Sequence, residues 1–254
     1  GNTAETTLGG SSAVSMGEST RASGPGSVAM GSQSEASGDQ AVAIGFDNTA
    51  SGNASTALGG NTQSSGIGSF AAGNSTIASG DGAVSFGNFA VANGTNSFAG
   101  GLNASANGAN SFVYGSGVTT LFTGNEAVSM GDRTIASGQG SVAMGSLSEA
   151  SGDQAVVIGF DNTASGNSSA ALGGNTQSSG IGSFAAGNST IASGDGAVSF
   201  GNFTIANGTN AFAGGVNASA DGVNSMAFGN GAVTSAPSAI SLGDVTQATG
   251  PGSV

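Results

Sequence analysis

The chain has 254 residues, 49 of them glycine, and its 14 Asp and Glu outweigh two Arg, with a net charge of −12 and no His, Cys or Trp. Neutralising a nucleic-acid backbone requires clustered Lys and Arg, so this charge argues against nucleic acid as a partner. Without His or Cys the chain lacks an imidazole base, a thiolate nucleophile and the usual zinc ligands, so we expect neither an enzyme nor a cofactor.

The first element of each repeated unit is a short apolar phrase closed by glycine. Residues 13–17 read AVSMG and residues 27–31 read SVAMG, and small and large residues alternate within the phrase, which is typical of a short strand. The closing glycines follow one another in steps of 14 residues, except for one step of 16. They are Gly17, Gly31, Gly45, Gly59, Gly73, Gly87, Gly101, Gly115, Gly131, Gly145, Gly159, Gly173, Gly187, Gly201, Gly215, Gly229 and Gly243.

A second, shorter element lies before another turn, seven residues after each closing glycine. It reads STRASG at 19–24 and QSEASG at 33–38, with small residues such as Ala22 and Ala36 at alternate positions. Glycine at every seventh residue costs a helix about 1 kcal/mol each relative to alanine, and no apolar stripe of helical period offsets that cost. We therefore predict an all-β solenoid of 14-residue rungs, each with two strands and two turns, in which strands stack in parallel.

The step of 16 and a long duplication organise the array. Two extra residues near Leu121 and Phe122 predict a bulge or a longer loop, and residues 57–89 recur unchanged as residues 171–203. We expect a first block of about eight rungs at 1–118 and, at 119–254, a second block of about eight rungs plus the start of a third, all in one continuous solenoid. Because the text at 238–254 restarts that at 12–28, we expect a fragment of a longer array.

The large residues of the strand phrase are the expected core. One wall of each rung supplies bulky residues at two positions and the facing strand supplies small ones, so a narrow core can close between them. Burial within one coil is too small to offset the conformational entropy of ordering the chain, which favours burial shared between chains through the small faces at Ala13, Ser15, Ala29, Ala43 and Ala57. The predicted roll core comprises Val14, Met16, Val28, Met30, Val42, Ile44, Leu58, Phe70, Phe86, Phe112, Val142, Met144, Phe184 and Phe200.

The stretches GSVAMGSQSEASGDQAVAIGFDNTASG (26–52) and GSVAMGSLSEASGDQAVVIGFDNTASG (140–166) resemble the head repeats of trimeric autotransporter adhesins of the YadA type. That family's 14-residue unit centres on S-V-A-I-G, followed by small residues and a second turn, and the resemblance covers nearly the whole chain. It implies a left-handed parallel β-roll and a homotrimer around one axis. It also implies an extracellular location on a bacterial surface, with an outer-membrane anchor in a region not in this chain, and attachment to extracellular matrix, host cells or neighbouring cells. The chain departs from the family pattern by Phe in SFAAG and by the absence of a neck, a stalk and an anchor.

Four phenylalanines just after closing glycines are candidates for a contact patch: Phe46, Phe89, Phe160 and Phe203. A single roll exposes these turn positions, so the rings either contact a neighbouring chain or touch a ligand. Two near-identical blocks in three chains would repeat the patch, which favours multivalent attachment to matrix or cell-surface ligands, or self-association into fibres.

Other functional classes stay open from the residues alone. A passive structural filament or phage-fibre shaft shares the repeat without binding a ligand, and binding tests separate it from an adhesin. An ice-binding solenoid needs a flat rank of identical residues, whereas one exposed series begins Arg21, Glu35, Thr49 and Gln63. Arg21 and Glu35 occupy the same place in successive units, which predicts that they are neighbours across rungs.

Four carboxylates lie at predicted turns, where they could be solvated or could bind a metal ion. The residues Asp39, Asp47, Asp153 and Asp161 fit solvated turns better than a calcium site, since the calcium-binding pattern G-G-x-G-x-D is missing.

No apolar run approaches the roughly 20 residues needed to span a bilayer, so we expect no membrane insertion by this segment.

Overall fold

The computed structural model describes residues 5–6 and 11–254, so the start of the predicted first block, residues 1–4 and 7–10, lies outside the described residues. Every element is a strand, and no helix in the described ranges could span a membrane. The chain divides into two compact units, Gly1–Ala127 and Val128–Val254, which share one architecture and are described separately. The expected division into blocks at residues 118 and 119 concerns the repeats and stays a prediction.

A long strand forms one wall of every rung. Within each unit these strands pair in parallel with the long strand of the next rung, residue i opposite residue i+14, as Val28 lies opposite Val42. In the first unit these strands are β2 (Val14–Glu18), β4 (Val28–Ser32), β6 (Val42–Phe46), β8 (Thr56–Gly60), β10 (Phe70–Asn74), β12 (Val84–Asn88), β14 (Phe98–Leu102) and β16 (Phe112–Ser116). In the second they are β18 (Val128–Asp132), β20 (Val142–Ser146), β22 (Val156–Phe160), β24 (Ala170–Gly174), β26 (Phe184–Asn188), β28 (Val198–Asn202), β30 (Phe212–Val216), β32 (Met226–Asn230) and β34 (Ile240–Leu242).

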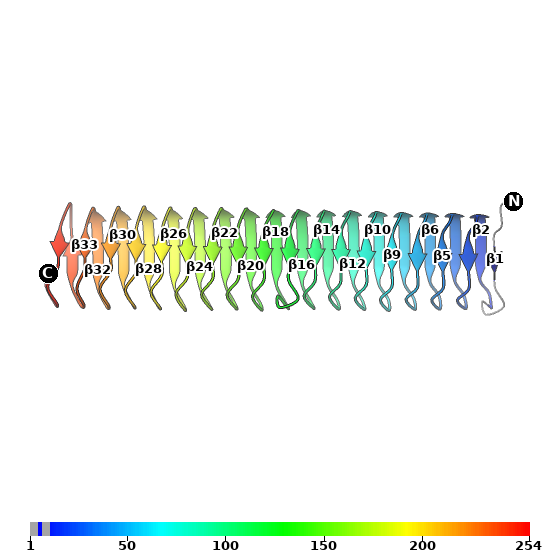
Figure 1. The fold of residues 1–254 in the computed structure, drawn as a ribbon, viewed down its shortest axis with the longest axis horizontal. Helices are drawn as coiled ribbons and strands as arrows, with labels where there is room; N and C mark the ends of the chain where they lie inside the picture. The colour runs from blue at the N-terminus through cyan, green and yellow to red at the C-terminus, as the bar shows by residue number, and fades with distance from the viewer. Residues whose placement is uncertain (1–4, 7–10) are drawn as a thin grey trace. The chain divides into compact units, whose positions relative to one another are not determined.

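A two-residue strand forms the opposite wall and runs against the long strand, as the alternating arrows of Figure 1 show. Short strands also pair in parallel with those of the next rung, as Ile77 lies opposite Val91. In the first unit they are β1 (Glu5–Thr6), β3 (Arg21–Ala22), β5 (Glu35–Ala36), β7 (Thr49–Ala50), β9 (Gln63–Ser64), β11 (Ile77–Ala78), β13 (Val91–Ala92), β15 (Ser105–Ala106) and β17 (Thr119–Thr120). In the second they are β19 (Ile135–Ala136), β21 (Glu149–Ala150), β23 (Thr163–Ala164), β25 (Gln177–Ser178), β27 (Ile191–Ala192), β29 (Ile205–Ala206), β31 (Ser219–Ala220), β33 (Val233–Thr234) and β35 (Gln247–Ala248).

The predicted two-residue insertion is confirmed as a longer loop between β17 and β18. Gly124 donates its N–H to the carbonyl of Leu121, and the N–H of Ala109 reaches Asn125 Oδ1, 16 residues on. The equivalent bond from the Asp39 N–H to Asn53 Oδ1 spans 14 residues. The two extra residues therefore enlarge one turn and leave the strand pairing before it unchanged.

The closing glycines are required because neighbouring rungs touch through their backbones there. Gly73 has a φ of +135°, and a Cβ on it would overlap the carbonyl oxygen of Gly87 in the next rung. Gly60, in contrast, lies at the end of β8, and a Cβ there would meet nothing nearer than Asn74 Oδ1 at 3.5 Å. Glycine is thus a steric requirement at the first position and dispensable at the second.

Substituting Gly73 with alanine is expected to destabilise the first unit by about 3 kcal/mol, because the backbone must leave an unfavourable φ and push the next rung away. The measurement is the thermal or denaturant unfolding midpoint followed by circular dichroism. Gly60→Ala is the matched control and should change the free energy of unfolding by less than about 0.5 kcal/mol. Equal effects of the two substitutions would contradict the steric assignment.

The interior of each rung is only wide enough for two short side chains, one from each wall. Ser15 Oγ on the long strand lies 2.9 Å from Thr20 Oγ1 on the facing wall, and Ser129 Oγ lies 2.8 Å from Thr134 Oγ1. Residues five apart in the sequence therefore face one another across the lumen. Alanine fills most of the remaining inward positions and is completely buried there, as at Ala43.

The prediction that the large side chains form the core of a single roll is wrong, because the lumen holds side chains no larger than those of valine, threonine and asparagine. Ala29, Ala43 and Ala57, expected at a contact between coils, are fully buried inside the roll, while Ala13 and Ser15 are half-buried in the first fully described rung. The large residues lie on the outer side of the long strands. Exposed are Val14, Met16, Ile44, Phe70, Phe86, Phe112, Met144, Phe184 and Phe200, and half-buried are Val28, Met30, Val42, Leu58 and Val142.

Candidate interaction surfaces

The outer side of the long strands is an apolar face in each unit. The first and third residues of each long strand point outward, as Val42 and Ile44 do on β6, and in-register pairing stacks them on their counterparts in β4 and β8. Met16 is 55% exposed, and most of its counterparts in later rungs are exposed or half-buried. A contiguous apolar surface of this kind marks a site of association.

Aromatic rings gather on this face around Gly100 in the first unit. The rings of Phe98 and Phe112 stack at 4.8 Å, and Phe86 meets Phe98 edge-on at 5.6 Å. A Cβ on Gly100 would lie 2.9 Å from the rings of Phe86 and Tyr114, so glycine makes room for them. In the second unit Phe200 packs against Phe212 and Phe228 around Gly214. The sequence analysis missed both clusters, although a glycine in an apolar column between aromatic rungs is their signal.

In each unit two of the four candidate phenylalanines lie at the turn from the long strand to the short strand, on one edge of that unit's roll. Phe46 ends β6 and Phe89 follows β12, three rungs further on. Both are exposed, Phe46 by 55% and Phe89 by 52%, as are Phe160 and Phe203 in the second unit. The predicted exposure is confirmed, and each unit brings two of the four rings to the same edge.

Phe89 and Phe203 are held in a strained backbone conformation. Their φ values are +56° and +57°, and the corresponding residues of other rungs have similar φ values, whether they are small, as Ser75 and Asn103 are, or bulky, as Leu147 and Val245 are. The left-handed region costs a bulky residue about 1–2 kcal/mol, whereas Asn tolerates it. Phe89 and Phe203 therefore bear this cost, as Leu147 and Val245 do in their own rungs.

Asparagine side chains lie between the two rings of each unit. Asn74 Nδ2 donates to Asn88 Oδ1 in the next rung at 3.1 Å, and Asn188 bonds Asn202 in the same way. We call this surface the Phe/Asn edge. In the first unit it comprises Phe46, Gly60, Asn61, Asn74, Asn88 and Phe89, and in the second Phe160, Gly174, Asn175, Asn188, Asn202 and Phe203.

Asn48 is a buried polar residue that the sequence analysis did not single out. It lies in the lumen with no exposed surface, and its Nδ2 donates to the carbonyls of Ile44 and Gly59 at 2.8 Å. Its Oδ1 accepts from both the N–H and the hydroxyl of Thr62 in the next rung. Asn162 makes the same set of contacts in the second unit. The signal was an Asn at an inward position that Thr, Ser, Ala or Val occupies in other rungs.

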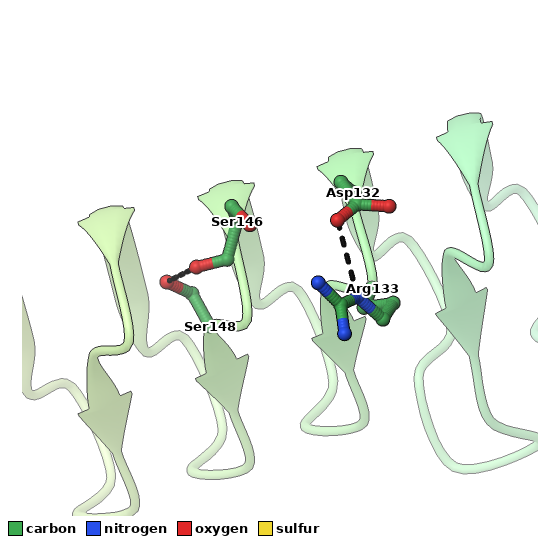
Figure 2. A network of polar contacts seen from close by, with 4 residues as sticks. All are labelled: Asp132, Arg133, Ser146 and Ser148. Carbon is green, nitrogen blue, oxygen red and sulfur yellow. Dashed lines mark hydrogen bonds and ion pairs between the residues drawn. The ribbon is translucent and has the colours of Figure 1, made fainter.

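Each of the two arginines forms an ion pair on the surface. Arg21 Nη1 lies 3.3 Å from Glu35 Oε1, which confirms the predicted neighbours across rungs. Arg133 Nε donates to Asp132 Oδ2 at 3.1 Å. In the next rung the Ser148 hydroxyl donates to the Ser146 carbonyl, and Figure 2 shows both contacts. All four charged side chains are largely exposed, so each pair contributes at most about 1 kcal/mol. Within residues 5–6 and 11–254, no three acidic residues come together as a metal site and no pocket forms.

Comparison with protein families identifies the repeat. A model described as the YadA head domain repeat, in two copies, matches more than half of the chain, at residues 9–34, 22–48, 36–62, 50–76, 64–90, 78–104, 123–148, 150–176, 178–204, 192–218, 206–232 and 220–245. The chain belongs to the YadA head family. The resemblance found in the sequence is thereby confirmed, as are the parallel solenoid and its 14-residue rungs. A search of curated proteins gave no match.

YadA head repeats build structural adhesins exposed on bacterial surfaces, and the family is not enzymatic. The matches leave out residues 105–122, which include β16 and the start of the enlarged loop. This interruption coincides with the 16-residue step, where the sequence departs from the YadA head period. The rungs on either side follow the family pattern.

Proposed function

We propose that this chain is a segment of the head of a homotrimeric surface adhesin, in which three left-handed rolls pack the apolar faces of their long strands together. The exposed apolar face carries the proposal. Side chains such as Met16, Ile44 and Phe86 gain about 1.5–3 kcal/mol each when they are transferred from water to a packed interface. Three copies around one axis bury three such faces against one another, which removes the largest apolar surface of each roll from water.

The proposed site of action is extracellular, on a bacterial surface, with the anchor supplied by a region outside this chain. Membership of the YadA head family supports both the trimer and the surface location. We propose that the turn edges and short-strand faces, which the packing of long-strand faces leaves free, attach the head to extracellular matrix, to host cells or to neighbouring cells. A passive filament without a ligand is the competing function.

Beads coated with the segment are expected to adhere to cultured cells or to surfaces coated with matrix proteins at least several-fold more than albumin-coated beads. The physical reason is multivalency, since repeated weak sites on one particle engage together. The measurement is the number of beads retained under a fixed washing force. Retention equal to that of albumin beads on cells, on matrix proteins and on surfaces coated with the segment itself would favour the passive filament.

A further inference from the structure

We propose that the Phe/Asn edge of each unit binds an extended neutral polysaccharide, whose sugar rings stack on the phenylalanines and whose hydroxyls bond the asparagines. This inference deepens the proposed attachment function and rests on it. It names a ligand class for a surface that the packing of long-strand faces leaves free.

The chemistry of the edge matches that of a sugar chain. A phenyl face packs against the C–H face of a pyranose ring, which is the least polar surface that a sugar offers. Asparagine supplies both an amide donor and a carbonyl acceptor. A sugar hydroxyl both donates and accepts hydrogen bonds, so it can use either group. The bond between Asn74 and Asn88 uses one donor of the first and one acceptor site of the second, so each keeps hydrogen-bonding capacity for a ligand.

The spacing of the edge also suits an extended chain. Phe46 and Phe89 lie three rungs apart, or about 14 Å at the usual separation of neighbouring strands. Each sugar of an extended β-linked hexose chain advances the chain by a length similar to the separation of neighbouring strands, so a chain lying along the edge places about one sugar beside each rung. Gly60, opposite Phe46 in the next rung, presents no side chain and leaves room for a ring beside that phenylalanine. Gly174 does the same beside Phe160.

The rings of Phe89 and Phe203 are available to a ligand outside the single roll. Each ring is more than half exposed, so it contributes little to the packing of its own unit. The exposed Leu147 and Val245 have the same left-handed φ, so the aromatic ring, and not the backbone conformation, distinguishes Phe89 and Phe203. The corresponding turn residue three rungs earlier, Asp47, is an ordinary left-handed residue.

The charge of the edge selects neutral chains over acidic ones. Asp47 and Asp161 lie beside Phe46 and Phe160, are exposed, and repel carboxylated or sulfated sugars. No lysine or arginine belongs to the Phe/Asn edge of either unit. A hydroxyl-rich chain without charge therefore fits this surface best.

The probes are cellohexaose and chitohexaose as extended neutral chains, with maltohexaose as a curved neutral chain and heparin as an acidic one. Binding of at least one β-linked hexasaccharide to the assembled segment is expected by saturation-transfer NMR and titration calorimetry, with maltohexaose at least fivefold weaker and no binding of heparin. The double variant Phe89→Asn, Phe203→Asn is expected to weaken the binding at least fivefold. Its unfolding midpoint should stay the same or rise, because asparagine accepts the left-handed conformation.

The matched control is Ile67→Asn, Ile181→Asn, which removes equally exposed apolar residues from the opposite turn and should leave the affinity unchanged. Unaltered affinity in the phenylalanine variant would overturn the inference. So would a fall in assembly mass in that variant, since the rings would then belong to a contact between chains. Adhesion of coated beads together with no binding of any hexasaccharide would overturn the inference and leave the proposed function standing.

Discussion

A chain in which Ala43 is replaced by glutamate is expected not to form the roll around that rung. Ala43 is completely buried, and Asn48, five residues on, faces it across the lumen with every polar atom already bonded. A carboxylate there has neither space nor a partner, and an unpaired buried charge with overpacking destabilises by more than about 4 kcal/mol. Loss of the strand signal in circular dichroism, or a large fall in the unfolding midpoint, is the measurement.

The control is the adjacent residue. Ile44 is exposed on the outer face of the same strand, so Ile44→Glu should leave the roll folded. A difference between neighbouring positions tests which side of the strand is inside, whereas a general intolerance of glutamate in β6 would affect both. If Ala43→Glu folded as well as Ile44→Glu, the assignment of the lumen would be wrong.

The double variant Ile44→Glu, Leu58→Glu is expected to convert the proposed trimer into folded monomers. The two residues lie opposite each other in successive long strands, so the variant places two carboxylates per chain on the apolar face. Six carboxylates around one axis repel one another and lose hydration, which prevents the faces from closing. Light scattering should report a threefold fall in mass, to the 23.5 kDa of one chain, with the strand signal in circular dichroism retained.

A substitution on the opposite wall provides the control. Ile77 lies on the short strand β11, away from the apolar face, and Ile77→Glu should leave the mass of the assembly unchanged. A double variant that kept the mass of three chains would show that the chains associate through another surface. Loss of assembly in Ile77→Glu alone would place the interface on the short-strand wall.

The period of the sequence was sufficient to predict the strands, the turns and the enlarged loop, because each depends on local chemistry. Alternation places Val28 and Met30 on one side of a strand and Ala29 on the other, and the structure follows that division. Alternation does not say which side is inside. The usual association of large residues with the interior gave the wrong answer. The tight turns bring the two walls so close that hydroxyl groups on opposite walls hydrogen-bond to each other. The uniformly small residues on the facing wall were the signal of so narrow a lumen.

The candidate site was predictable in part for a similar reason. The exposure of Phe46 and Phe89 follows from their position after a closing glycine, which the sequence displays. The contact between Asn74 and Asn88 depends on how side chains from successive rungs meet, and a residue pattern read along one rung does not contain it. The same holds for Asn48, whose partners come from two rungs.

The backbone contact at the closing glycines limits how such a protein changes in length. Since the carbonyl of Gly87 fills the place of a side chain on Gly73, neighbouring rungs fit only when both have the same path through that turn. Removing or adding 14 residues leaves every remaining contact of this kind intact, whereas other insertions must be absorbed in a loop, as between β17 and β18. Recombination between similar coding repeats can thus lengthen or shorten the roll in whole rungs while every remaining backbone contact of this kind is kept.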